Sequence, residues 1–166
     1  QSWTPLQDRT DNAQGLHLNV IAATGAALYL AGEQGLLRKW DSGTQRFVSL
    51  PSPYDGSFFT AELPAQRAIV VAGLRGNVWR STDGGAQWTP LASPVPATIT
   101  AMATAADGGL LLASQAGVVL RLQGDALQPL KAPPVPMPSA LLPLQDGPLL
   151  TLGVAGVVPV DAGALQ

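Results

Sequence analysis

Glycine recurs at a fixed interval in four similar segments, and this period constrains the fold more than any other feature of the sequence. Each segment is an apolar run, a turn that ends in glycine, and a second β-prone run. The turn glycines lie 41, 41 and 39 residues apart, at Gly35, Gly76, Gly117 and Gly156. Glycine readily adopts the positive φ angles that tight turns require. The spacing therefore predicts a repeated strand–turn–strand unit.

Two further β-prone runs complete each repeat. One precedes the glycine turn, as in "SFFTAEL" from Ser57, and the other follows it and closes on leucine and proline, as in "WTPLASP" from Trp88. Four strands in about forty residues are typical of a propeller blade, whereas β-sandwiches do not repeat with a fixed period. The sequence therefore predicts an all-β fold, a single propeller region of four repeats with four-stranded antiparallel blades.

The expected blades span residues 16–50, 57–91, 98–130 and 140–166, and the last of them is incomplete. Residues 1–6, "QSWTPL", match the outer-strand sequence "AQWTPL" at 86–91, which predicts an orphan outer strand at 1–6. Two arrangements stay open. The strand completes the last blade and closes a four-bladed ring, or the chain is half of a larger propeller, whose ends pair with a missing N-terminal half or a second chain. Unpaired strand edges favour such pairing.

The composition narrows the classes of function. The 166 residues suffice for one domain with a core, and charged residues make up only 12%. The net charge of −2 argues against a nucleic-acid partner, since such modules are normally basic. The chain has no cysteine, and its one histidine, His17, lies in the alternating run "LHLNV". We therefore expect no metal site and no cofactor.

One polar turn stands out in a chain poor in charge and aromatic residues. It runs from Ser81 to Trp88, "STDGGAQW", and contains Asp83 and Gly85. Serine and aspartate side chains in a turn accept hydrogen bonds from the following backbone N–H groups. Tryptophan supplies a large apolar body between strands. We expect a structural role for this turn; the alternative is that Asp83 is a catalytic carboxylate or a calcium ligand, although calcium requires several converging oxygens.

The turn matches the S-x-D-x-G-x-x-W pattern of the Asp-box, or BNR repeat. Its blade context, "VAGLRGNVWRSTDGGAQW", resembles the photosystem II assembly/stability factor family, which has relatives in non-photosynthetic bacteria. Degenerate copies of the box retain only the aspartate and a glycine, at Asp41 and Gly43 and at Asp161 and Gly163. The resemblance implies a non-enzymatic assembly scaffold, periplasmic or otherwise extracytoplasmic, that binds a protein partner in a membrane-protein complex.

The alternative function is a glycan-binding or sialidase-like propeller. Sialidases resemble one another in an arginine cluster, a tyrosine nucleophile and an acidic partner. Here the tyrosines are Tyr29, within an apolar strand, and Tyr54, in a loop. The cations Lys39, Arg80 and Arg121 each lie four residues after a turn glycine, which places them at one repeat position rather than around one centre. We therefore expect no catalytic site.

The tips of the glycine turns differ from blade to blade, although the scaffold around them repeats. In a four-stranded meander these turns lie on the face opposite the Asp-boxes. Variation on a repeated scaffold is typical of an interaction surface, and arginine is favoured at interfaces. Glu33 and Arg75 at two of these tips are therefore the candidate partner-binding residues.

Overall fold

Short antiparallel strands dominate the computed structural model, which describes residues 2–25, 27–65, 67–145 and 147–160. Blade 1 contains β1 (Leu18–Thr24), β2 (Ala27–Gly32), β3 (Leu37–Asp41) and β4 (Arg46–Ser49). Blade 2 contains β5 (Phe58–Ala65), β6 (Ala68–Gly73), β7 (Val78–Ser81) and β8 (Thr89–Pro90). Blade 3 contains β9 (Ile99–Thr104), β10 (Leu110–Ser114), β11 (Val119–Gln123) and β12 (Ala126–Pro129). Blade 4 contains β13 (Pro138–Pro143), β14 (Leu149–Gly153) and β15 (Gly156–Val160).

Each blade is one sheet whose strands are neighbours in the same order as in the sequence. This meander confirms the all-β fold of four repeats. The only helical turns among the described residues are three single 3₁₀ turns: η1 (Gln7–Arg9), η2 (Glu33–Gly35) and η3 (Leu74–Gly76). The second and third are the glycine turns of blades 1 and 2, where Gly35 and Gly76 have φ angles of 70° and 72°.

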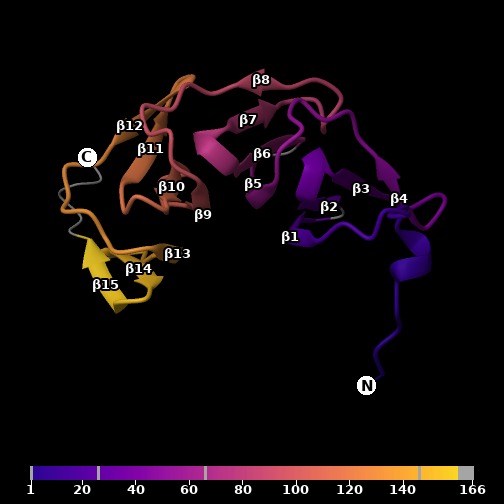
Figure 1. Ribbon diagram of the computed structural model, residues 1–166, viewed down its shortest axis with the longest axis horizontal. Coiled ribbons are helices and arrows are strands. Elements are labelled where there is room, and N and C mark those ends of the chain that lie inside the picture. The colour runs from indigo at the N-terminus through magenta and orange to yellow at the C-terminus, as the bar shows by residue number, and fades with distance from the viewer. Residues whose placement is uncertain (1, 26, 66, 146, 161–166) are drawn as a thin grey trace.

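The four blades stand side by side in an open arc, with blade 1 and blade 4 at its two ends (Figure 1). The first strand of each blade lies on the inner side of the arc, and β4, β8 and β12 lie on the outer side (Figure 1). Successive inner strands are in contact, β1 with β5, β5 with β9 and β9 with β13. The arc therefore brings equivalent positions of all four repeats together along its concave side.

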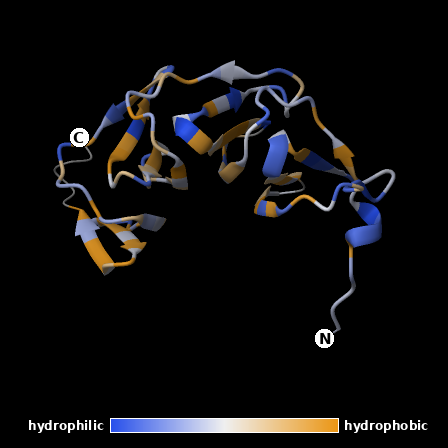
Figure 2. Cartoon of the chain, viewed as in Figure 1, coloured by the Kyte–Doolittle hydropathy of each residue, from blue (hydrophilic) through white to orange (hydrophobic). Residues whose placement is uncertain are grey.

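The core consists of three layers of apolar side chains between successive blades. Tyr29 and Ala31 of β2 share the first layer with Ile69 and Val71 of β6. Residues one position further along each strand face the other way, so Val70 of β6 shares the second layer with blade 3. Burial of these aliphatic side chains drives the stacking of the blades. Figure 2 shows hydrophobic residues concentrated in the strands, whereas the region of η1 is hydrophilic.

A small residue ends the second strand of each blade because the inner strand passes very close to it. A Cβ atom added to Gly32 would lie 2.2 Å from the carbonyl oxygen of His17, and one added to Gly73 would lie 2.0 Å from that of Ser57. Gly153 is constrained in the same way by the carbonyl oxygen of Met137, at 2.5 Å. These close approaches fix the inner strands against the rest of each blade.

Residues 2–6 form no strand in this structure, which corrects the expectation of an outer strand at 1–6 for the described part of that segment. The side chain of Trp3 is fully exposed. The physical reason is the open arc: the segment lies beside blade 1, whose four strands are already paired, and β15 lies at the opposite end (Figure 1). Asp161 and Gly163, the second degenerate Asp-box, lie outside the described residues.

Candidate functional site

Each inner strand carries a β-bulge at the same repeat position. The pairing register of β1 with β2 skips one residue between Leu18 and Val20, and the registers of the three other inner strands skip at the equivalent place. The skipped residues are Asn19, Phe59, Thr100 and Ser139. A bulge turns a side chain out of the regular pleat and is frequent beside functional sites.

The four bulge residues line one hollow of about 650 Å³ on the concave side of the arc. The remaining lining residues come from the segment before β13, from the ends of two strands of blade 4 and from two glycine turns: Met137, Pro138, Gly153, Gln115 and Val154. Three apolar side chains in this hollow are unusually exposed, Phe59 at 39%, Met137 at 54% and Val154 at 74%. No residue among those that line the hollow is ionisable. An apolar concave surface with a few hydroxyl and amide groups is typical of a binding site.

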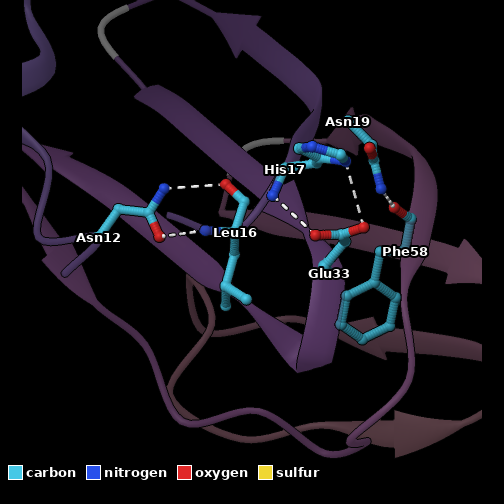
Figure 3. Close-up of polar contacts among 6 residues, drawn as sticks. All are labelled: Asn12, Leu16, His17, Asn19, Glu33 and Phe58. Atoms are coloured by element: carbon cyan, nitrogen blue, oxygen red, sulfur yellow. Dashed lines mark hydrogen bonds and ion pairs between the residues drawn. The ribbon is translucent and has the colours of Figure 1, made fainter. Parts of the chain in front are cut away.

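Two bulge residues also fasten adjacent blades. Asn19 Nδ2 donates a hydrogen bond to the carbonyl oxygen of Phe58 at 2.9 Å (Figure 3). Thr100 Oγ1 donates to the carbonyl oxygen of Pro138, the equivalent position in blade 4, at 2.6 Å. Phe59 has no such donor, and its ring is left exposed toward the hollow. On the concave side, Asn19 and Thr100 are therefore held by hydrogen bonds between blades, whereas the ring of Phe59 is available to a ligand.

The predicted partner-binding residues, Glu33 and Arg75, are not among the residues that line this hollow. Glu33 is tied to the start of the inner strand, because the backbone N–H of His17 donates to its Oε2 at 2.8 Å and His17 Nδ1 lies 3.2 Å from Oε1 (Figure 3). Arg75 is exposed and has a φ angle of 57°. The equivalent turns of blades 3 and 4 supply Gln115 and Val154 to the lining. Two of the four glycine turns therefore contribute directly to the hollow.

The polar turn of blade 2 is held by its own side chains. Ser81 Oγ donates to Asp83 Oδ1 at 2.8 Å and accepts from the backbone N–H of Gly85 at 2.8 Å. Asp83 Oδ1 also accepts from the backbone N–H groups of Ala86 and Gln87, at 2.9 and 3.0 Å. These bonds, first that from Gln87 and then that from Ser81, lower the pKa of Asp83 from its ordinary value of 3.8.

The same turn reaches across to blade 1. The indole of Trp88 is half-buried against the layer between blades 1 and 2, and its Nε1 donates to the carbonyl oxygen of Pro51 at 2.9 Å. Tyr29 Oη of blade 1 donates to the carbonyl oxygen of Gly84 at 3.4 Å. The turn therefore links two blades at the outer side of the molecule, away from the residues that line the concave hollow.

The degenerate copy in blade 1 keeps part of this arrangement. Asp41 Oδ1 accepts from the backbone N–H of Gly43 at 2.8 Å and from that of Thr44 at 3.4 Å. These bonds, chiefly that from Gly43, lower the pKa of Asp41. The aspartate therefore closes a turn here as well, without the serine and tryptophan.

The repeated cations do not converge on one centre. Arg80 pairs with Asp125 of the next blade, and Arg121 pairs with Asp107 within its own blade. Lys39 lies over the ring of Tyr29, with Nζ 5.5 Å from the ring centroid. Tyr54 lies in the inter-blade segment, with its ring against Phe58. No cluster of three potential metal ligands occurs in the described ranges, and no helix within them has the length and apolarity of a membrane span.

The bulge residues were missed by the sequence reasoning, which selected the turn tips. The bulge position carries a different type of residue in each of the inner strands "LHLNVIA", "SFFTAEL" and "TITAMAT". An extra residue in a short strand has no distinct pattern, because β-branched and polar residues occur on both sides of it.

Solved structures with the same arrangement identify the fold as that of a β-propeller. The structure entitled YCF48 bound to D1 peptide superposes with a TM-score of 0.62 at 15% identity, covering 82% of this chain and 46% of that one. The computationally designed Ika4 protein superposes with a TM-score of 0.71 at 15% identity, covering 93% of this chain and 99% of Ika4. The extracellular domain of BT4673 from B. thetaiotaomicron gives 0.68 at 14% identity, covering 84% and 21%.

These likenesses concern the fold. The chain spans about half the length of the YCF48 chain, 46%, and about a fifth of the BT4673 chain, 21%. No protein-family model and no curated protein matches the sequence.

Proposed function

We propose that this chain is a non-enzymatic protein-binding propeller, which binds an extended segment of a protein partner in the concave hollow. The observation that carries the proposal is the convergence of four bulge residues, from four blades, on one largely apolar hollow with exposed Phe59 and Met137. Methionine and aromatic side chains adapt to apolar partners and are enriched at interfaces. The absence of ionisable groups from the lining favours an uncharged, apolar segment.

The arrangement suits an extended chain better than a compact ligand. Equivalent positions recur from blade to blade along the concave wall, and Thr100, Ser139 and Gln115 supply hydroxyl and amide groups between the apolar ones. An extended peptide presents apolar side chains and backbone polar groups in alternation. Glu33 and Arg75, in the glycine turns of blades 1 and 2, would then contact charged residues that flank the bound segment.

The type of partner and the location of the site are proposed from resemblance to other propellers. YCF48 has been solved with a D1 peptide, and the Asp-box turn of blade 2 supports the same type of propeller. We propose that the partner belongs to a membrane-protein complex and that the site is extracytoplasmic, which agrees with the extracellular BT4673 domain of similar fold. The proposed structural role of Ser81, Asp83, Gly85 and Trp88 is to fasten blade 2 to blade 1.

Peptide selection followed by mutation tests this proposal. A random peptide library would be panned against the immobilised chain, and the enriched peptides would be labelled and titrated by fluorescence anisotropy. Phe59→Ala and Met137→Ala are each expected to weaken binding by about tenfold or more, because exposed apolar anchors dominate such sites. Val48→Ala is the matched control, since Val48 on β4 is as exposed as Phe59, at 39%.

Two outcomes would contradict the proposal. In the first, no peptide is enriched, or the enriched peptides bind the Phe59 and Met137 variants as well as the unchanged chain. In the second, a glycan array or a fluorogenic sialoside gives a signal that Tyr29→Phe or Tyr54→Phe abolishes. The second result would establish the glycan-binding or sialidase-like class instead.

A further inference from the structure

The two ends of the arc expose opposite faces of the repeated blade. In an internal blade, the second strand presents alternate residues to the preceding blade and to the following blade. The side that packs against the following blade, the forward face, carries Tyr29 and Ala31 in blade 1 and Val70 and Ala72 in blade 2. The side that packs against the preceding blade, the back face, carries Ile69 and Val71 in blade 2.

Blade 1 leaves its back face without a partner blade. Its repeat-equivalent residues are Leu28 and Leu30, and the pairing of β1 with β2 places Ile21 opposite Leu30 on the same side. These residues line a mostly apolar hollow of about 450 Å³, together with Leu6, Leu18 and Phe47. Ile21 is 69% exposed, which is far outside the burial of its counterparts in the internal layers.

Blade 4 leaves its forward face without a partner blade. Leu149 of β14 is buried in the layer against blade 3, so Leu150 and Leu152 point to the other side. Leu142 pairs with Leu150, and Val157 pairs with Leu152. Leu142 is 51% exposed and Val157 is 60% exposed. The end of the arc is therefore an apolar sheet face of the kind that packs on a back face elsewhere in the molecule.

Among the described residues, blade 4 has no counterpart of the outer strand that residues 2–6 resemble. Three strands of this blade are described, and β15 forms its outer edge. In blade 2 the matching sequence "QWTPL" supplies β8, and its Leu91 is 4% exposed. The equivalent Leu6 is 40% exposed, and Trp3 is fully exposed. In the repeat, the outer strand of one blade comes directly before the inner strand of the next, as β8 comes before β9, so the sequence at 2–6 matches the outer edge of a blade packed on the back face of blade 1.

We propose that two copies of this chain assemble head to tail into a closed ring, in which the forward face of blade 4 packs on the back face of blade 1 of the other copy. The segment 2–6 of each copy then forms the fourth strand of the other copy's blade 4. Two copies are chosen because the superposed 82% of this chain covers 46% of the YCF48 chain, so that the superposed parts of two arcs equal about one such chain in length. A head-to-tail contact forms a closed assembly only when the rotation closes.

The mass of the purified chain in solution, measured by sedimentation or light scattering, tests the proposal directly. The expected mass is twice the 17.1 kDa of one chain at micromolar concentrations. Ile21→Glu and Val157→Glu should each weaken the dimer by about a hundredfold or more, since each buries an unpaired charge. Both residues are largely exposed in the single chain, so both variants should keep its circular dichroism spectrum. Val48→Glu, on the outer strand β4 and 39% exposed, is the control and should remain dimeric.

Mixing the two variants separates head-to-tail contact from any symmetric contact of one face with itself. In the mixture, the intact blade 4 of the Ile21→Glu chain meets the intact blade 1 of the Val157→Glu chain at one junction, whereas the other junction carries both glutamates. The mixture should therefore form a heterodimer that is weaker than the unchanged dimer, although each variant alone is monomeric. Truncation of residues 1–6 should weaken the dimer and leave the fold intact. A monomeric unchanged chain, open filaments, or a dimer insensitive to Ile21→Glu and Val157→Glu would overturn the proposal. A monomer would assign the two faces to further blades of a longer polypeptide.

Discussion

The hydroxyl of Ser81 and the carboxylate of Asp83 lie 2.8 Å apart, and together they accept the backbone N–H groups that follow them in the turn. Gly85 donates to the serine, and Ala86 and Gln87 donate to the aspartate. One carboxylate oxygen, Oδ1, thus accepts three hydrogen bonds from within the turn. The charged form of Asp83 is favoured in the folded chain, so the contribution of this turn to the free energy of unfolding depends on pH.

Asp83→Asn tests that dependence. The folded pKa of Asp83 is lowered, so its contribution to stability is present above the ordinary value of 3.8 and is lost as the pH falls through the lowered pKa. The variant should therefore unfold at lower urea concentration than the unchanged chain at pH 7, and the difference should shrink in acid. Thr82→Ala, at an exposed position of the same turn, should show no such difference. An offset independent of pH would contradict the charge argument.

Trp88→Ala should destabilise the contact between blades 1 and 2. The change removes a half-buried indole from that layer and the hydrogen bond to Pro51. Complete burial would correspond to about 3–5 kcal/mol, so a half-buried ring should cost about 2 kcal/mol in the free energy of unfolding. Trp88→Phe keeps much of the apolar contact and should recover about half of the loss, as measured by urea titration. A chain unaffected by Trp88→Ala would remove the structural role proposed for the turn.

Thr100→Val tests the hydrogen bond that joins blades 3 and 4. The variant keeps the shape of the side chain but leaves the carbonyl oxygen of Pro138 without the donor at 2.6 Å. Such a loss costs about 1 kcal/mol, and it should appear as faster hydrogen exchange in β13 and β14. Ser139→Ala removes a longer bond to Leu152 within the blade, at 3.2 Å, and should leave this exchange nearly unchanged. Equal effects of the two variants would contradict the inter-blade role.

Gly76→Ala and Gly124→Ala separate backbone strain from close approach. Both glycines have positive φ angles, 72° and 62°, so both variants should lose about 1–2 kcal/mol from strain. A Cβ atom at position 76 would also lie 2.3 Å from the carbonyl oxygen of Val95, whereas position 124 has no atom within 4 Å. Gly76→Ala should therefore cost about 1–3 kcal/mol more than its control. Equal losses in thermal unfolding would mean that the inter-blade segment moves aside freely.

The repeat was predictable because turn glycines and apolar strands recur with one period. The same period gave the strand order, since each repeat contains four β-prone runs joined by short turns. The alternation of Leu28 and Tyr29, or Ile69 and Val70, between two layers follows from the two-residue period of a strand. What a side chain contacts on the next blade does not follow, because that depends on how the sheets stack.

The concave site was less predictable than the fold. A bulge at Asn19 or Thr100 depends on one unpaired residue in a register, which neither composition nor spacing reveals. Glu33 and Arg75 were predicted as partner-binding residues because glycine marks their turns, and this role stays a prediction. The conformation of residues 2–6 could not be predicted for a similar reason: their sequence is that of an outer strand, but a strand also requires an adjacent free edge.

Hydrogen exchange of the chain with and without a selected peptide tests the central claim most directly. The account predicts that the peptide slows exchange in the bulge segments of the inner strands, around Phe59, Thr100 and Ser139, and in the turn at Gln115. The turn from Ser81 to Trp88 should exchange at an unchanged rate. Protection confined to that turn or to the outer strands, with none along the concave hollow, would contradict the proposed site.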